Sequence, residues 1–166
     1  MNILFAGDGG QGIQTIASIF SEAIFSDKKF FVSAIPNFGL EQRGGVSLVF
    51  VRLSDEEIKY PKFSVADILL ILSEQADERT QVYRAKETLV IDSKKFLHIL
   101  QEENIEKTSL NIFLLGFLTS LLTKDKILTK KQVFKILKTK LEKKANWLEN
   151  KKAFSLGFEI FNKNKL

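Results

Sequence analysis

The pattern of hydrophobic and polar positions predicts strands that alternate with helices through the first part of the chain. Ile3 to Ala6 form a short apolar run that ends at a glycine-rich turn, and from Ile13 to Phe20 apolar residues recur at helical spacing. A second apolar run follows at 30–35. This succession has the proportions of a βαβ unit, so we expect the first two strands to pair in parallel.

Further strands and one polar helix are expected before residue 100. The strands are expected at 46–53, 66–72 and 88–92. The second of these is almost wholly apolar, as is typical of a central parallel strand covered on both faces. A polar helix is expected at about 74–84 and a short segment at 94–100, whereas 36–45 is expected to be a loop rich in glycine and polar residues.

The remainder of the chain predicts helices. They are expected at 109–122, 130–143 and 146–162. Together with 166 residues in all, this order predicts one α/β domain over 1–166. Its architecture should be a three-layer, mostly parallel Rossmann-like sheet with a helical C-terminal tail. The longest apolar run, 110–122, is shorter than the roughly 20 residues of a membrane span, so we expect a buried helix and no membrane contact.

Charge is concentrated at the C-terminal end. From residue 124 onward there are 13 lysines, no arginine and four acidic residues, although the whole chain carries only +5. Such a segment can contact nucleic acid or another anionic partner. The lysines alternate with apolar residues at helical spacing, which favours a solvated face of an amphipathic helix instead. We therefore expect no nucleic-acid partner.

Residue usage excludes several classes of enzyme. The chain has no cysteine and one histidine, His98, so it cannot by itself build a disulfide, a cysteine-held iron–sulfur cluster or a Cys/His zinc site. No nucleophile-elbow pattern accompanies His98, which disfavours a Ser–His–acid triad. No catalytic residue and no metal site are therefore predicted on this chain. The N-terminus has no basic leader, and an acid stands at position 8, so a cytoplasmic location is expected.

The first glycine turn is a candidate phosphate site. Gly7, Gly9 and Gly12 satisfy G-x-G-x-x-G between a predicted strand and a predicted helix, where glycines permit close backbone approach and helix amides favour an anion. Two features disfavour an ordinary NAD site: the second strand does not end in an acid, and Asp8 places a negative charge in the turn. The alternative is that these glycines only allow the helix to pack closely on the sheet.

A second loop, at 39–45, carries Arg43 between glycines. A guanidinium beside exposed backbone amides suits a carboxylate or phosphate, or a contact with another subunit. The alternative is a local ion pair with Glu41, which contributes little at a surface. Both glycine loops should follow the carboxyl ends of strands, so they are expected to face one crevice.

Several motifs, spread in order over most of the chain, resemble one known family. They are Gly7-Asp8-Gly9-Gly10-Gln11-Gly12, the set Pro36, Phe38, Gly39, Glu41, Arg43, Gly44 and Gly45, the set Arg52, Ser54, Ile58 and Pro61, the pair Ala66-Asp67, and two helical sets, Asn111 with Leu115 and Gly116 and Asn150 with Ala153 and Gly157. On these residues the chain is similar to the gamma subunits, or gamma domains, of the 2-oxoacid:ferredoxin (acceptor) oxidoreductases, which act on pyruvate, 2-oxoglutarate or 2-oxoisovalerate.

The resemblance implies a non-autonomous subunit, inactive alone, of a complex that oxidatively decarboxylates a 2-oxoacid to an acyl-CoA. It implies alpha-, beta- and delta-type partner subunits and, through the complex, ferredoxin or flavodoxin as the acceptor. Thiamine diphosphate and iron–sulfur clusters are implied on other subunits, and this chain is linked to assembly and to the side where coenzyme A acts. The implied contacts for coenzyme A or a neighbouring subunit are Gly7, Gly9, Gly10, Gln11, Gly12, Arg43, Gly44 and Gly45.

Two predictions distinguish a subunit of such a complex from the main alternative, a stand-alone nucleotide-binding protein. A subunit needs an apolar surface for its partner, and the 15 phenylalanines supply material for one. A stand-alone nucleotide-binding Rossmann-like protein that uses the first glycine turn would instead bind a dinucleotide by itself.

Overall fold

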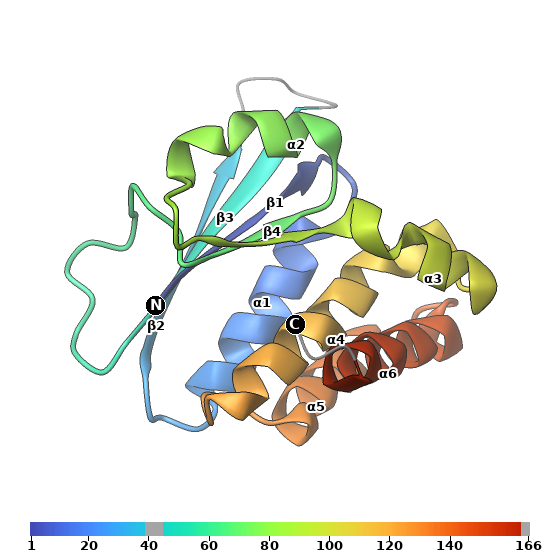
Figure 1. The fold of residues 1–166 in the computed structure, drawn as a ribbon. Helices are drawn as coiled ribbons and strands as arrows, with labels where there is room; N and C mark the ends of the chain where they lie inside the picture. The colour runs from blue at the N-terminus through green and yellow to red at the C-terminus, as the bar shows by residue number, and fades with distance from the viewer. Residues whose placement is uncertain (39–44, 164–166) are drawn as a thin grey trace.

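The computed structural model describes residues 1–38 and 45–163, which form a sheet between two helical layers of unequal size (Figure 1). The described strands are β1 (Asn2–Asp8), β2 (Phe31–Phe38), β3 (Val46–Ser54), β4 (Ile68–Ile71) and β5 (Leu89–Asp92). The described helices are α1 (Ile13–Phe25), α2 (Glu74–Arg79), α3 (Leu97–Glu102), α4 (Leu110–Lys124), α5 (Lys130–Leu141) and α6 (Trp147–Lys163), with 3-10 turns η1 (Gln81–Tyr83), η2 (Ser93–Phe96) and η3 (Lys107–Ser109). The element order predicted from the sequence is confirmed.

The strand order is β2-β3-β1-β4-β5. β1 pairs in parallel with β4, and β4 with β5, whereas β3 is antiparallel to both of its neighbours, β1 and β2. Four of the five described strands therefore point the same way, but two of the four pairings are antiparallel, so the α/β sheet is mixed rather than mostly parallel. The expected pairing of the first two strands was wrong, because β3 lies between them. β1 and β2 share a direction without sharing hydrogen bonds.

The prediction that a loop begins at Pro36 was also wrong. β2 continues through Pro36, which is opposite Val49 of β3, and ends at Phe38. β2 is the edge strand of the sheet, with a neighbour on one side only. Proline is tolerated on an edge strand because its missing N–H can face away from the ladder.

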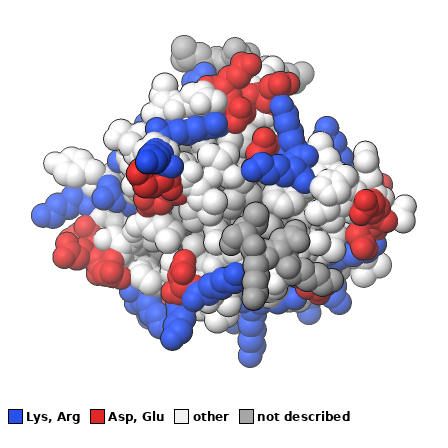
Figure 2. Space-filling view, in the orientation of Figure 1, with Lys and Arg blue, Asp and Glu red and all other residues white. Residues whose placement is uncertain are grey.

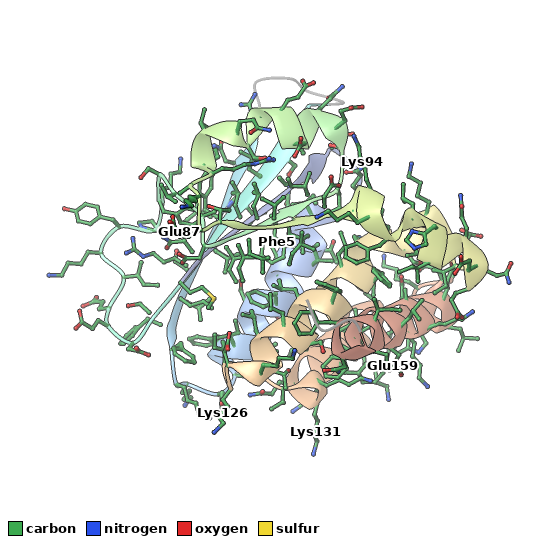
Figure 3. The ribbon with its side chains drawn as sticks, in the orientation of Figure 1. Phe5, Glu87, Lys94, Lys126, Lys131 and Glu159 are labelled. Carbon is green, nitrogen blue, oxygen red and sulfur yellow. The ribbon has the colours of Figure 1, made fainter. Side chains whose placement is uncertain are left out.

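Side-chain alternation divides the core between the two faces of the sheet. Ile3 and Phe5 of β1 pack with α1 and the C-terminal helices in the larger apolar cluster, and Figure 3 shows Phe5 beneath the sheet on this side. Leu4 and Ala6 join the smaller cluster, which Ala76 of α2 closes. All four side chains are fully buried, as expected of a central strand covered on both faces.

The buried helix predicted at 110–122 is α4, which packs against α6 at very short range. A Cβ on Gly116 would lie 2.2 Å from the backbone oxygen of Phe154, and a Cβ on Gly157 would lie 2.0 Å from the backbone oxygen of Phe113. The two glycines therefore allow the two helix backbones to touch, which explains the paired helical motifs of the sequence. No helix within 1–38 and 45–163 combines the length and apolar character that crossing a bilayer requires.

The C-terminal lysines are spread over helix surfaces, and several of them interact with this chain's own groups. Lys140 pairs with Glu22, and Lys152 pairs with Glu103, while Lys124 lies over the ring of Phe161. On the face shown in Figure 2, basic and acidic side chains are interspersed. Lys126 and Lys131 project outward at the helical end of the molecule in Figure 3. These features favour the solvated helix faces expected from the lysine spacing.

Candidate functional site

The glycine turn lies where the connections of the sheet reverse direction. β1 ends at Asp8, and α1 begins at Ile13 and packs on one face of the sheet, whereas α2 follows the neighbouring strand β4 and packs on the other face. Because helices leave adjacent parallel strands toward opposite faces, their carboxyl ends border a crevice. Sheets of this kind place ligands at such a switch point.

The backbone of the turn is held by the side chain of Gln11. Its Oε1 accepts the backbone N–H of Asp8 at 2.8 Å, and the backbone N–H of Gln11 donates to the Asp8 oxygen at 3.1 Å. Gly10 and Gly12 adopt positive φ values of 94° and 73°. These two conformations favour glycine, which explains their place in the motif. Gln11 therefore shapes the turn as well as lining it.

Gly12 is the N-cap of α1 and offers no side-chain cap to the first helical amides. The first turn of α1 holds no acidic residue. An uncapped N-terminus of a 13-residue helix presents N–H groups and the positive end of the helix dipole. The local electrostatics therefore favour an anionic group at this end of α1.

Asn111 in the first turn of α4 fixes the turn from the other side. Its Nδ2 donates to the backbone oxygen of Gln11 at 3.0 Å, and its Oδ1 accepts the backbone N–H of Ile112. A Cβ on Gly12 would lie only 2.3 Å from this Nδ2. Two features therefore require glycine at position 12: its positive φ and the close approach of Asn111 from α4.

The carboxylate of Asp8 is bonded to the hydroxyl of Ser73. Ser73 Oγ donates to Asp8 Oδ1 at 2.6 Å and accepts the backbone N–H of Ala76 as the N-cap of α2. The negative charge that the sequence places in the turn therefore has a hydrogen-bonding partner on the next strand connection. This bond ties the two sides of the switch point together.

A pocket of about 340 Å³ opens beside the turn. It is lined by Gly10, Gln11, Gly12, Leu72, Lys107, Thr108, Leu110 and Asn111. Lys107 and Thr108 belong to η3 and are exposed. The Lys107 ammonium group and the backbone amides together form a donor set that suits a phosphate or carboxylate, whereas the Thr108 hydroxyl donates to Glu106 Oε2. Among the described residues, no group of His, Asp or Glu side chains is arranged to hold a metal ion.

Gly45, the last residue of the second glycine loop, is bonded to the first glycine turn. The backbone N–H of Gly9 donates to the oxygen of Gly45 at 3.0 Å. Arg43 and Gly44, the other predicted contacts of the second loop, lie outside the described residues, so their roles stay predictions. Gly9 and Gly10 are exposed at the surface of the turn.

Gly7 has a different place from the other glycines. It is buried within β1, and a Cβ there would lie 2.6 Å from Gln11 Oε1 and 2.7 Å from Ile13 Cδ1. Gly7 thus permits close packing of the turn and α1 on the strand. For this residue the geometry matches the alternative in which a glycine serves helix–sheet packing.

Sequence reasoning missed Ser73 and Lys107 as contributors to this site, and it placed Asn111 in a helical motif without linking it to the turn. Ser73, Lys107 and Asn111 reach the turn from segments far along the chain. A serine directly before the polar helix is a typical N-cap signal, which could have identified Ser73 as a cap. Its bond to Asp8, and the approach of Lys107, depend on strand order and helix placement that no local pattern contains.

The fold and the site together define a Rossmann-like α/β protein with a glycine turn at its topological switch point. Residues 2–160 match the pyruvate ferredoxin/flavodoxin oxidoreductase family. The chain therefore belongs to this family and corresponds to its gamma-type subunit, as the motifs implied.

Relatives and solved structures agree with this assignment. The chain is 30% identical to the 2-oxoglutarate synthase subunit KorC of Archaeoglobus fulgidus, covering 96% of this chain and 87% of that protein. It is 33% identical to KorC of Methanocaldococcus jannaschii, covering 95% of this chain and 92% of that protein.

The structural neighbours show the same fold. The gamma subunit of a keto/oxoacid ferredoxin oxidoreductase from Geobacter sulfurreducens aligns with a TM-score of 0.72 at 22% identity, covering 98% of both chains. The 2-oxoglutarate:ferredoxin oxidoreductase from Magnetococcus marinus, solved with 2-oxoglutarate, coenzyme A and succinyl-CoA bound, aligns with a TM-score of 0.79 at 19% identity. That alignment covers 98% of this chain and 31% of the longer one.

Proposed function

We propose that this gamma-type chain, as one domain over 1–166, assembles with alpha-, beta- and delta-type subunits into a 2-oxoacid:ferredoxin oxidoreductase. The complex oxidatively decarboxylates a 2-oxoacid to an acyl-CoA and passes electrons to ferredoxin or flavodoxin. The observation that carries the proposal is the family match over 2–160, supported by relatives aligned over nearly their whole length. A cytoplasmic location stays a prediction, which cell fractionation with antibody detection would test.

The chemistry of decarboxylation and electron transfer is assigned to the partner subunits. The chain has no cysteine and so supplies no thiolate for an iron–sulfur cluster. Thiamine diphosphate is assigned to other subunits by the family relationship. The role left to this chain is to bind and orient, and the isolated chain is expected to be inactive.

We infer that the pocket at the glycine turn contributes to the coenzyme A side of the complex. Support comes from the uncapped N-terminus of α1 and from Lys107 at the pocket wall, since both favour an anionic group such as the phosphates of coenzyme A. Arg43 lies outside the described residues and stays a contact for coenzyme A that the sequence motif predicts. In this role the chain holds coenzyme A without taking part in bond making.

The test of the assembly is co-purification of this chain from its native cell extract at moderate salt, with mass and cofactor analysis of the accompanying proteins. Larger subunits that carry thiamine diphosphate and iron support the proposal. A chain that emerges alone with a bound dinucleotide contradicts it and supports a stand-alone nucleotide-binding protein.

The assay of the complex should begin with 2-oxoglutarate, because the two relatives aligned over nearly their whole length are 2-oxoglutarate synthase subunits. Pyruvate should be assayed in parallel, because a pyruvate synthase subunit PorC is 44% identical over 59 residues. The ratio of kcat/KM for the two substrates identifies the 2-oxoacid.

The role at coenzyme A is tested by Arg43→Ala and Lys107→Ala in the assembled complex. We expect KM for coenzyme A to rise, with subunit composition and KM for the 2-oxoacid unchanged. Gly9→Val should raise KM for coenzyme A further than either cationic variant does, because a β-branched side chain disturbs the turn that bonds to Gly45. An unchanged KM for coenzyme A in both cationic variants would remove this crevice from the coenzyme A site.

A further inference from the structure

An open groove lies between α1 and the edge strand β2. It has a volume of about 360 Å³ and is lined by Gln14, Ala17, Ser18, Ser21, Glu22, Ala34, Pro36 and Val49. Ala34 and Pro36, which line it from β2, are exposed. Small side chains on both walls leave room for a further element to approach the sheet closely beside α1.

The groove contains a buried hydroxyl without a partner. Ser21 is 8% exposed, yet its Oγ has no hydrogen-bond partner among the described residues. The helical hydroxyls of Thr119 and Thr123 bond to the carbonyl four residues earlier, whereas the buried hydroxyl of Ser120 in α4 shares the lack of a partner among the described residues. A buried unsatisfied hydroxyl costs about 1–3 kcal/mol. Because Ser21 also lines the groove, a group supplied from outside this chain can satisfy its hydroxyl.

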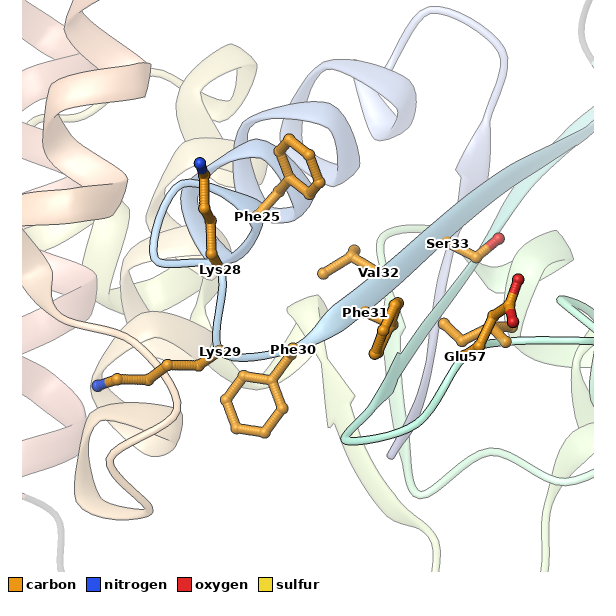
Figure 4. A pocket seen from close by; sticks show the side chains of 9 residues that line it. Phe25, Lys28, Lys29, Phe30, Phe31, Val32, Ser33 and Glu57 are labelled. Atoms are coloured by element: carbon orange, nitrogen blue, oxygen red, sulfur yellow. The ribbon is translucent and has the colours of Figure 1, made fainter.

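A second hollow lies at the start of β2. This hollow, of about 450 Å³, is lined by Phe25, Lys28, Lys29, Phe30, Phe31, Val32, Ser33, Glu57 and Ile58. Phe25 is 65% exposed and Phe31 is 51% exposed, and Figure 4 shows them on either side of Val32. Phe25 is one helical turn after Ser21, and Val32 is two residues before Ala34, so each pair shares one face of its element, and the hollow lies beyond the groove along both α1 and β2.

The residues at and before the edge strand β2 indicate which kind of secondary structure can dock beside it. Pro36 removes a backbone donor from β2, and lysines at 28 and 29 precede the strand, and both devices disfavour the addition of another strand. A helix lying on the face of β2 needs no such donors. Lys29 pairs with Asp27, whereas Lys28 has no ion pair among the described residues, so a carboxylate at this end would complement it.

We propose that the groove and hollow receive an amphipathic helix of another subunit of the oxidoreductase. Its apolar side packs on Ala34, Pro36 and Phe25, a polar side chain bonds to Ser21, and an acidic residue lies near Lys28. The proposal rests on the proposed function, since it requires partner subunits.

The test uses the complex purified from cells through a tag on this chain. Ala34→Arg fills the groove with a charged side chain at an exposed position, and Leu148→Arg on α6, where Leu148 is 79% exposed, is the matched control. We expect Ala34→Arg to reduce the recovery of the other subunits at least tenfold, with the control like the wild type. Thermal unfolding of each isolated full chain checks that both variants fold.

A photocrosslinking arm identifies the occupant. With p-benzoylphenylalanine in place of Phe25, we expect a crosslink to a helical, acid-containing peptide of another subunit, and none from the same group in place of Leu148. An intact complex with Ala34→Arg, or a crosslink to a second copy of this chain, overturns the docking proposal and leaves the proposed function intact. If the wild-type chain recovers no other subunit, both proposals are overturned.

Discussion

Asn111 occupies the space that a Cβ on Gly12 would need, because its Nδ2 would lie 2.3 Å from that atom. The same nitrogen donates to the oxygen of Gln11 at 3.0 Å, so α4 and the N-terminus of α1 hold each other in place through the glycine turn. A contact between residues a hundred positions apart thus sets the shape of the candidate site. The turn depends on long-range packing as well as on its own glycines.

Gly12→Ala should destabilise the protein more than Gly10→Ala does. Both residues have positive φ, so alanine at either position costs about 1–2 kcal/mol in backbone strain. A Cβ on Gly10 meets nothing within 4 Å, whereas one on Gly12 meets Asn111. We expect the free energy of unfolding of Gly12→Ala to be lower by at least about 1 kcal/mol more, from the additional overpacking. Urea denaturation of the two variants measures the difference.

The double variant Gly12→Ala with Asn111→Ala provides the control. It removes the side chain that the new methyl group meets, so part of the extra loss should be recovered relative to Asn111→Ala alone. Equal destabilisation by Gly10→Ala and Gly12→Ala would show that the approach of Asn111 does not constrain the turn.

Substitutions of Ser73 separate its two bonds. Ser73→Ala removes the N-cap of α2 and the donor to Asp8, so we expect a loss of about 1–2 kcal/mol in the free energy of unfolding. Ser73→Asn retains a good cap and a donor, and should be close to the wild type. Ser73→Asp also retains a cap but places a second carboxylate beside Asp8, so it should be destabilised at pH 7 and relieved in acid. Similar stabilities of the Asn and Asp variants at pH 7 would contradict the role of the bond to Asp8.

Local patterns in the sequence predicted most elements because each carried its own signal. The apolar run at 66–72, interrupted only by Asp67, predicted the buried strand β4, which spans Ile68–Ile71. Strand order was predicted less well, since nothing local to β3 indicates that it inserts between β1 and β2 in antiparallel orientation. Pro36 was misread for a related reason: a proline is compatible with a strand only at an edge, and the edge is a property of the whole sheet.

The candidate site, like the fold, could be predicted from the sequence only in part. The glycines of the first turn were recognisable because positive φ and close approach restrict the residue type at Gly7, Gly10 and Gly12. Asn111 was recognisable as part of a helical motif, but its hydrogen bond to the turn requires the placement of α4. The sequence therefore indicated which residues are constrained, and the structure shows which of them meet.

The contact between α4 and α6 predicts a cost for alanine at either glycine. Alanine is intrinsically about 1 kcal/mol more favourable than glycine within a helix. If helix propensity alone decided the outcome, replacing either glycine by alanine would therefore stabilise the protein. A Cβ on Gly116 or Gly157 would instead lie 2.2 Å or 2.0 Å from a backbone oxygen of the other helix, and a backbone cannot rotate away as a side chain can. We expect each single variant to lose about 2 kcal/mol or more.

Because either methyl group forces the same separation of the two helices, the loss in the double variant Gly116→Ala with Gly157→Ala should be smaller than the sum of the single losses. Thermal unfolding of the three variants checks this non-additivity. Stabilisation by either alanine would contradict the close helix contact.

The ion pair between Glu22 and Lys140 predicts a small, pH-dependent contribution to stability. Lys140 Nζ lies 2.5 Å from Glu22 Oε1 and joins α5 to α1, and this hydrogen bond lowers the pKa of Glu22 from its ordinary value of 4.5. A lowered pKa in the folded state means that the stabilisation is present above pH 4.5 and is lost as the pH falls through the lowered value. Both side chains are partly exposed, so screening keeps the contribution below about 1 kcal/mol.

Glu22→Gln should therefore lower the free energy of unfolding slightly at pH 7, and its difference from the wild type should vanish in acid and shrink in high salt. Glu142→Gln, which removes only a 3.8 Å contact between Lys138 and the C-cap of α5, is the control and should change little. Denaturation curves at several pH values decide the matter, since a difference for Glu22→Gln that persisted in acid would mean that the carboxylate charge is not its source.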